Sequence, residues 1–413
     1  MAQGPLAGRY GGVVLDCDGV LYLRDQVIAS APPALRGIRS LGVRVAFVTN
    51  NSAVPPADVA RRLERLGVQA DPAEVSTSAQ AVVGLLGGRE RLDGVRVLVL
   101  GGEGLREALA RAGAALLGPQ DDWRSARIVA VGLDTGLTYD RVRRAALAID
   151  AGARFVGSNP DGSLPTPEGP WPGAGSLLAM LEAATGRRAE VAGKPEPPLL
   201  ETAARSLGDG PFLMVGDRAD TDVAAARRLG WDSALVLTGA TATEDLPDLV
   251  AVPTWLLRDL GGLLGPVPAA VRHARRDELD AAGRLLAGHA PPGEAGARAG
   301  RSGGGDRGPA EQPASRRAVL VAATAEGLTG AVAWSLEGDR ATLDGPVVVP
   351  AARGALAGTR LLVAACAAAR AAGARRAGAA GPAGFLGPLG FRPGADGRRA
   401  RPLAPPGQRV RGA

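Results

Sequence analysis

The chain has 413 residues, of which 46% are hydrophobic, and it carries a formal net charge of +6 at neutral pH. This length is enough for two or three domains with packed cores. No apolar run approaches the roughly 18 residues of a membrane span, the first ten residues lack the apolar centre of a signal peptide, and two cysteines provide no disulfide framework, so we expect a cytoplasmic protein with no membrane partner.

The positive charge is concentrated in the last third of the chain. Residues 1–265 carry 27 basic and 31 acidic side chains, whereas residues 266–413 carry 21 and 11. The arginines of this tail are scattered among Ala and Gly, and few aromatic residues accompany them for base stacking. We therefore expect no nucleic-acid partner.

Lysine and asparagine are rare in this chain. Lys194 is the single lysine, and the three asparagines are Asn50, Asn51 and Asn159. Because Arg serves everywhere else as the general cation, we expect these four residues to do what Arg, Asp or Ser cannot.

The first predicted strand ends in two aspartates. Val13–Leu15 is a short apolar run rich in β-branched residues, and Asp16, Asp18 and Gly19 follow it. Ligands of open α/β sheets bind just beyond the carboxyl ends of strands. Two carboxylates this close repel each other and favour a cation beside them, and Mg²⁺ takes oxygen ligands. Taken alone, the same stretch is also compatible with an ordinary Asp/Gly turn.

A second predicted strand, Val43–Val48, also ends in polar residues. Thr49, Asn50 and Asn51 follow it, and a helix begins near Pro55. Hydroxyl and N–H groups at such a strand end form an anion site. Capping of the helix by Asn or Ser is the alternative explanation.

Residues 79–187 form a second α/β pattern. Its predicted strands lie at 95–100, 128–133 and 154–156. The segment Gly101–Gly104 lacks the spacing of a dinucleotide-binding loop, so we interpret it as a strand-to-helix turn. A polar, Gly- and Pro-rich loop that contains Asn159 and Asp161 follows the third strand. Loops of this kind face ligands or other domains.

The first pattern resumes near Lys194. The predicted buried strand Phe212–Val215 ends in Asp217, and Asp222 lies five residues later. A doubly wound sheet brings the ends of such strands to one edge. Acidic groups, a metal ion, a lysine and loop N–H groups at one point are typical of a phosphoryl-transfer site.

These motifs, in this order and spacing, resemble those of the haloacid dehalogenase superfamily of phosphatases. The inserted segment 79–187 resembles the α/β cap of its NagD-like subfamily, and the resemblance covers residues 11–264. It implies an α/β fold with a doubly wound, Rossmann-like core formed by residues 1–78 and 188–265. It also implies a Mg²⁺-dependent phosphatase that forms an aspartyl-phosphate.

The resemblance assigns a role to each motif residue. Asp16 would be the nucleophile, Asp18 the general acid and base, and Lys194 the fixed cation of the catalytic set. The phosphate would be bound by Cys17, Gly19, Thr49, Asn50 and Asn51. Asn159 and Asp161 would contact the substrate from the cap. Mg²⁺ would be bound by Asp16, Asp18 through its carbonyl, Asp217 and Asp222.

The tail, residues 266–413, contains a predicted helix at 277–286, a stretch near 290–317 that we predict to be disordered, three strands and a long Ala-rich helix. This order resembles the α+β fold of GCN5-related N-acetyltransferases. That family binds coenzyme A with an R-x-x-G-x-G/A loop, but Leu356 occupies the first glycine position here. The tyrosine often used as general acid is also missing near Phe385. We therefore expect a structural or regulatory module that does not bind acetyl-CoA.

A roofed site with a polar cap loop predicts a small phosphorylated metabolite with hydroxyl groups as substrate. Glycerol 3-phosphate fits this description and the combination of domains. The alternatives are 2-phosphoglycolate, pyridoxal 5′-phosphate and a broad activity of the 4-nitrophenylphosphatase type. An N-acetyltransferase or a non-catalytic regulatory protein is the alternative from another class. The sequence leaves the oligomeric state open, a homo-oligomer included.

Overall fold

The computed structural model describes residues 4–87, 92–166, 168–287, 316–324, 327–349, 356–394 and 398–404. The chain forms two compact units: unit 1 contains residues 1–239 and 258–265, and unit 2 contains residues 240–257 and 266–413. The sequence prediction placed 240–257 with the core, whereas compactness groups this segment with the tail. The predicted domain boundaries stay predictions. The predicted disordered stretch lies outside the described residues, except that residues 316 and 317 begin a strand.

The core of unit 1 is a parallel sheet whose strands run in the order β14-β13-β1-β4-β5. The strands are β1 (Gly12–Asp16), β4 (Arg44–Thr49), β5 (Val75–Thr77), β13 (Phe212–Gly216) and β14 (Asp232–Val236). Every residue of β1 is buried, as expected for a parallel strand between two layers of helices. Leu15 pairs with Val215 and Asp16 with Val48, so β1, β4 and β13 end at the same edge. The predicted Rossmann-like core is confirmed.

Helices connect these strands. They are α1 (Ala31–Ser40), α2 (Pro56–Arg65), α3 (Ser78–Gly87), α7 (Pro198–Leu207) and α8 (Ala224–Arg228). Prolines occupy the first turns of α1, α2 and α7, where a missing N–H costs no hydrogen bond. A single π-helical turn, η4 (Ala219–Val223), leads from β13 into α8. A small hairpin of β2 (Tyr22–Leu23) and β3 (Gln26–Val27) follows β1.

A second parallel sheet has the order β12-β9-β8-β6-β7. Four of its strands lie in the inserted segment, and β12 follows the predicted end of that segment at residue 187. The strands of this sheet are β6 (Arg96–Leu100), β7 (Ala115–Leu116), β8 (Ile128–Val131), β9 (Arg154–Gly157) and β12 (Glu190–Val191). The other elements are α4 (Glu103–Arg111), α5 (Tyr139–Asp150), α6 (Ala174–Thr185) and an antiparallel hairpin of β10 (Ser163–Thr166) and β11 (Gly169–Pro172). One buried cluster contains Val14 and Met214 of the first sheet together with Leu105 and Ile128 of this segment. The two sheets of unit 1 therefore share a hydrophobic core.

Unit 2 contains a seven-stranded sheet with the order β16-β17-β18-β19-β20-β22-β21. The strands are β16 (Ala270–His273), β17 (Arg316–Thr324), β18 (Gly327–Glu337), β19 (Arg340–Val348), β20 (Arg376–Ala379), β21 (Arg392–Pro393) and β22 (Arg399–Pro402). β19 and β20 pair in parallel, and the other neighbours are antiparallel.

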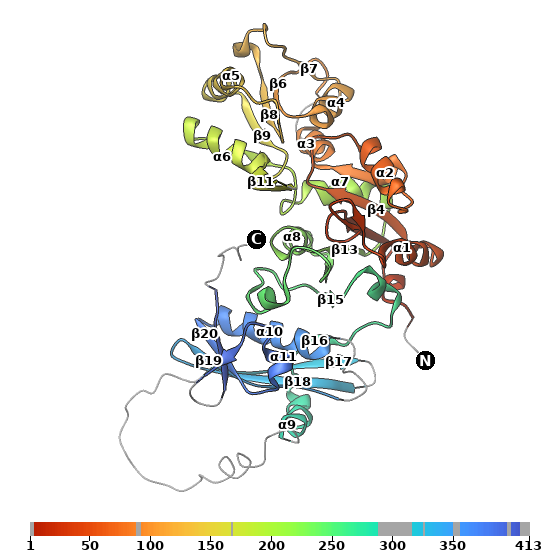
Figure 1. The fold of residues 1–413 in the computed structure, drawn as a ribbon, viewed down its shortest axis with the longest axis vertical. Helices are drawn as coiled ribbons and strands as arrows, with labels where there is room; N and C mark the ends of the chain where they lie inside the picture. The colour runs from red at the N-terminus through yellow and green to blue at the C-terminus, as the bar shows by residue number, and fades with distance from the viewer. Residues whose placement is uncertain are drawn as a thin grey trace. The chain divides into compact units, whose positions relative to one another are not determined.

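Helices cover both faces of the sheet of unit 2. Figure 1 shows α10 (Ala357–Ala371) and α9 (Leu279–Ala287) on opposite sides of β18 and β19. The segment 240–257 contributes the short helix η5 (Thr243–Asp248), which packs on α10, and β15 (Trp255–Leu257). A last short helix, α11, spans Ala383–Leu386. The acetyltransferase-like fold of this region stays a prediction.

Candidate active site

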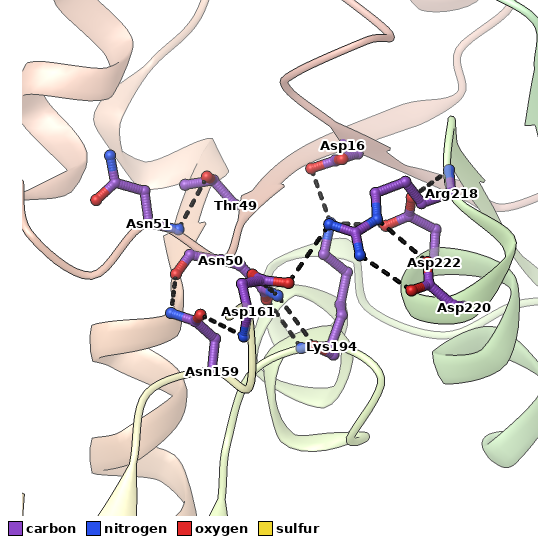
Figure 2. A network of polar contacts seen from close by, with 10 residues as sticks. All are labelled: Asp16, Thr49, Asn50, Asn51, Asn159, Asp161, Lys194, Arg218, Asp220 and Asp222. Atoms are coloured by element: carbon purple, nitrogen blue, oxygen red, sulfur yellow. Dashed lines mark hydrogen bonds and ion pairs between the residues drawn. The ribbon is translucent and has the colours of Figure 1, made fainter. Parts of the chain in front are cut away.

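The single lysine of the chain lies between two carboxylates. Lys194 Nζ is 2.7 Å from Oδ1 of Asp16, at the end of β1, and 2.7 Å from Oδ1 of Asp222 on η4 (Figure 2). The lysine side chain is 3% exposed. Burial acts to lower the pKa of Lys194, but the two carboxylates outweigh burial and raise this pKa above its usual value. The ammonium group is therefore a fixed positive charge in a nearly dry site.

Three carboxylates meet at the same place. Oxygen atoms of Asp16, Asp217 and Asp222 lie within 4.8 Å of one another. Burial raises the pKa of Asp16, and Asp222 and Asp217 raise it further, whereas Lys194 opposes the rise. One ammonium group cannot balance three carboxylates, so an excess of negative charge remains. Hard oxygen donors with such an excess fit Mg²⁺. The carboxylate of Asp18 is not part of this cluster, and its predicted carbonyl ligand stays a prediction.

Glycines allow Asp217 to approach β1. Gly19 has φ +73°, in the left-handed region that favours glycine, and its carbonyl accepts a hydrogen bond from Thr238 Oγ1 at 2.5 Å. A Cβ atom at Gly19 would lie 2.2 Å from a carboxylate oxygen of Asp217, and one at Gly239 would lie 2.0 Å from it. Only glycine backbone, without a side chain, therefore lies against the Asp217 carboxylate at these two positions.

Asp18 lies two residues after Asp16, at the solvent side of the site. Although the residue reaches solvent, protein atoms around its carboxyl group displace enough water to raise its pKa, and Arg62 and Tyr22 oppose this rise. The Tyr22 hydroxyl donates to Asp18 Oδ2 at 3.3 Å, and the Arg62 guanidinium lies 4.5 Å from the Tyr22 ring centre. The sequence analysis missed both partners. Cys17 is fully buried, and burial raises its thiol pKa.

Two of the polar residues after β4, Thr49 and Asn51, contact each other. Asn51 N–H donates to Thr49 Oγ1 at 3.1 Å, and the Asn51 side chain accepts from the N–H of Ala53 at 2.8 Å. Asn51 therefore forms a local turn. It does not cap α2, whose N-cap residue is Pro55 without a side-chain hydrogen bond, so the capping alternative is wrong for Asn51. Thr49 is nearly buried at the edge where β1 and β13 also end. Direct phosphate contacts of Cys17, Gly19, Thr49, Asn50 and Asn51 stay predictions.

Asn50 connects Lys194 to the inserted segment. Its Nδ2 donates to Asp161 Oδ2 at 2.8 Å and to the Lys194 carbonyl at 3.0 Å, and its Oδ1 accepts from the Lys194 N–H at 2.9 Å. Its carbonyl accepts from Asn159 Nδ2 at 2.6 Å and from Ser78 Oγ at 2.6 Å. Figure 2 shows the network that these residues form beside Asp16. The sole lysine and all three asparagines thus lie in this one region.

Arg218, which follows Asp217 directly, is a site residue that the sequence analysis missed. Its Nε and Nη2 donate to Asp220 at 3.1 and 3.0 Å, and its Nη1 lies 3.5 Å from Oδ1 of Asp161. Asp161 therefore has Asn50 on one carboxylate oxygen and Arg218 near the other. The substrate contacts predicted for Asn159 and Asp161 stay predictions, and both side chains already contact other residues of the chain.

In unit 2, Leu356 immediately precedes α10 and has φ +53°. This left-handed conformation favours glycine, as expected if Leu356 occupies a former glycine position. Arg353 and Gly354, from the same predicted loop, lie outside the described residues.

Among the residues that the structure describes, no helix is both long and apolar enough to cross a membrane.

The comparisons with known proteins agree with this geometry. A family model described as haloacid dehalogenase-like hydrolase matches residues 13–115, and a second HAD-hydrolase-like model matches 191–263. An acid sugar phosphatase of Staphylococcus haemolyticus is 36% identical over 254 residues, which are 61% of this chain and 94% of that protein. The solved 4-nitrophenylphosphatase of Thermotoga maritima is 32% identical, with a TM-score of 0.58, over 63% of this chain and 98% of that one.

A further solved structure extends over both units. The glycerol phosphate phosphatase of Mycobacterium tuberculosis, in complex with magnesium, is 28% identical, with a TM-score of 0.67. The match covers 93% of this chain and 97% of that one. The chain belongs to the haloacid dehalogenase-like hydrolase family, as a NagD-like, Mg²⁺-dependent phosphoric monoester hydrolase.

Proposed function

We propose that this chain hydrolyses a small hydroxylated phosphate monoester, glycerol 3-phosphate first, through an aspartyl-phosphate on Asp16. The observation that carries this proposal is the position of Asp16 in the cluster with Asp217 and Asp222, 2.7 Å from the ammonium group of Lys194. A carboxylate nucleophile needs positive charge nearby, because a phosphate dianion repels it.

The reaction has two displacement steps. A carboxylate oxygen of Asp16 attacks phosphorus, the ester P–O bond breaks, and Asp18 gives its proton to the leaving alkoxide. Asp18 then takes a proton from water, whose oxygen attacks phosphorus and releases phosphate from Asp16. The raised pKa of Asp18 supports this role, because the acid keeps its proton to higher pH than an ordinary aspartate.

Charge neutralisation involves Lys194 and the carboxylate cluster. Asp16, Asp217 and Asp222 would hold Mg²⁺, which supplies positive charge to the phosphoryl oxygens when it is bound. Lys194 supplies a second, permanent cation. Its compact ammonium group reaches between two carboxylates, a space in which a planar guanidinium needs more room.

The substrate assignment is supported by two comparisons of different extent. The mycobacterial glycerol phosphate phosphatase matches 93% of this chain, unit 2 included, whereas the acid sugar phosphatase matches 61%. Hydrogen bonds of Asn50 with Asn159 and Asp161 hold the polar loop of the inserted segment at the end of β4, where we propose that the phosphate binds, and this supports a short substrate. Sugar phosphates are the competing class, since the staphylococcal relative is 36% identical.

A panel of phosphate esters tests this proposal. The purified chain with Mg²⁺ is assayed on glycerol 3-phosphate, 2-phosphoglycolate, pyridoxal 5′-phosphate, hexose phosphates and 4-nitrophenyl phosphate. We expect kcat/KM for glycerol 3-phosphate to exceed every other value by about tenfold, which corresponds to roughly 1.4 kcal/mol of transition-state binding. If kcat/KM for another ester is higher by that margin, glycerol 3-phosphate is not the preferred substrate, but the phosphatase activity itself stands. An inactive enzyme across the panel would reject the proposal itself.

A further inference from the structure

Unit 2 contains a small cavity that none of the predicted phosphatase residues lines. It has a volume of about 150 Å³ and lies between α10 and the segment 249–256. Its walls are mainly apolar, and they include Leu249, Val252, Trp255, Leu256, Val271 and Val363. Leu249, Trp255, Leu256 and Val363 are buried, whereas Val252 is 40% exposed. The cavity therefore has an apolar interior and reaches the surface near Val252.

One charged side chain, Arg360 of α10, lines this cavity. Arg360 is only 7% exposed, and in the described part of the chain no carboxylate lies within ion-pair distance of its guanidinium. The absence of an acidic neighbour is unusual, because buried arginines are normally paired. Burial alone lowers the pKa of Arg360 to about 10, so the group is still charged at neutral pH.

The neutral partners of Arg360 leave part of its hydrogen-bonding capacity unused. Nη1 donates to the Ala269 carbonyl at 2.6 Å, Nη2 donates to the Thr254 carbonyl at 3.0 Å, and the guanidinium lies 5.2 Å from the Trp255 ring centre. A guanidinium has five N–H donors, so three remain after these two bonds. These contacts hold Arg360 in place, but they provide no opposite charge for it.

We propose that this cavity binds a small monocarboxylate with a compact apolar body, whose carboxylate pairs with Arg360 and whose body packs among Leu249, Trp255 and Val363. One guanidinium neutralises one carboxylate, and the fork of N–H donors matches two oxygens. A phosphate dianion fits less well, because one guanidinium balances only one of its two charges and no other charged side chain of the described residues lines the cavity. A dry cavity of about this size holds benzene in another protein, which sets the size of the body.

Titration of the full-length chain with benzoate and 3-methylbutanoate tests the proposal, by calorimetry and by ligand-observed NMR. Benzamide, which is neutral and nearly the same shape as benzoate, is the ligand control, and inorganic phosphate tests the anion class. We expect a benzoate Kd below about 1 mM and a benzamide Kd at least about tenfold higher. Equal binding of the two, tighter binding of phosphate, or no saturable binding of either acid up to about 10 mM would overturn the proposal.

Three variants locate the site. Arg360→Gln should weaken benzoate binding by at least about tenfold and leave benzamide unchanged. Ala364→Leu, which fills the cavity from α10, should abolish binding of both. Arg375→Gln removes an exposed positive charge of the same unit and should change neither. If Arg360→Gln does not fold, the benzoate–benzamide difference and Ala364→Leu decide the question. If Arg360→Gln or Ala364→Leu binds benzoate with wild-type affinity, benzoate does not bind in this cavity and the proposal is wrong. Phosphatase activity is assayed separately, so the two proposals fail independently.

Discussion

The side-chain amide of Asn50 donates to Asp161 Oδ2 at 2.8 Å across 111 residues of sequence. The same amide donates to the Lys194 carbonyl and accepts from the Lys194 N–H. One side chain therefore holds the backbone of Lys194 and ties the polar loop of the inserted segment to the end of β4. An aspartate at this position could not donate, and it would place a second negative charge beside Asp161. This explains why one of the three asparagines of the chain lies here.

Replacement of Asn50 by alanine should impair catalysis more than stability. The change frees the backbone on both sides of Lys194, so its ammonium group no longer has a fixed position against Asp16, and we expect kcat to fall by about 10- to 100-fold. Steady-state kinetics on the best substrate measures this loss. Gln120→Ala, which removes an exposed amide from the same unit, is the matched control. An Asn50→Ala enzyme with unchanged kcat would show that Lys194 is positioned by other contacts.

Asp16→Asn should abolish turnover and leave the fold intact. The change removes the attacking charge at nearly constant volume, so we expect kcat to fall by several orders of magnitude. Stability in EDTA should change by no more than about 1–2 kcal/mol, because the loss of the ion pair with Lys194 is offset by relief of repulsion from Asp217 and Asp222. Asp140→Asn, at an exposed pair with Arg143, is the control. Substantial residual turnover would remove Asp16 as nucleophile.

Lys194→Arg should be as damaging as the loss of a catalytic group. The ammonium group is buried, with 2.7 Å contacts to two carboxylates, and a planar guanidinium cannot make both without displacing neighbours. We expect kcat/KM to fall by about 100-fold or more. The reverse change at a surface pair, Arg188→Lys beside Glu182, should have no effect. Activity within about twofold of wild type would contradict the role of Lys194.

The rarity of lysine and asparagine made this part of the site predictable. In a chain that uses arginine as its general cation, a residue type that occurs once or three times is informative. Asn50 does bond to the backbone of Lys194 and accepts a hydrogen bond from Asn159. Arg218 carried no such signal, because arginine is common in this chain. Its position directly after Asp217 was the only available indication.

The polar contacts that residues 240–257 make within unit 2 could not be predicted from apolar patterning. Such patterns show that a segment is buried, but they do not show which charged residues it contacts. The segment makes long-range polar contacts within unit 2. Asp248 Oδ2 accepts a hydrogen bond from Arg401, 153 residues away, and the Leu249 carbonyl accepts one from Arg370 at 2.6 Å. Pairings between distant charged residues have no local sequence signature.

The buried thiol of Cys366 should make the folded state lose stability at alkaline pH. Burial raises the pKa of Cys366 to about 12, whereas an unfolded thiol ionises near 9. Between these two values the unfolded state has released a proton that the folded state keeps. Stability therefore falls as pH rises through this window, by at most about 1.4 kcal/mol per pH unit from this group.

Urea unfolding at pH 8 and pH 10.5 of wild type and Cys366→Ala checks this contribution. The cavity left by the substitution lowers stability equally at both pH values, so only the difference in slope reports the thiol. We expect Cys366→Ala to lose less stability than wild type between the two pH values. Parallel losses would mean that the thiol ionises equally well in both states.

Gly19→Ala should disturb the metal-binding side of the site beyond the ordinary cost of a left-handed alanine. Gly19 and Gly42 have φ values of +73° and +76°, so each substitution costs about 1–2 kcal/mol of backbone strain. A Cβ at Gly42 has nothing within 4 Å, whereas one at Gly19 would lie 2.2 Å from a carboxylate oxygen of Asp217. Gly42→Ala is therefore a control for the strain alone.

Because Asp217 must move away from an added methyl group, we expect Gly19→Ala to raise the Mg²⁺ concentration for half-maximal activity by about tenfold or more. Gly42→Ala should leave this concentration unchanged and lower only the melting temperature, measured for both variants in EDTA. The Tm of Gly19→Ala should fall further than that of Gly42→Ala, since the clash adds to the strain. If the two variants show the same Mg²⁺ dependence, the close approach of Asp217 to Gly19 does not hold the carboxylate in its metal-binding position.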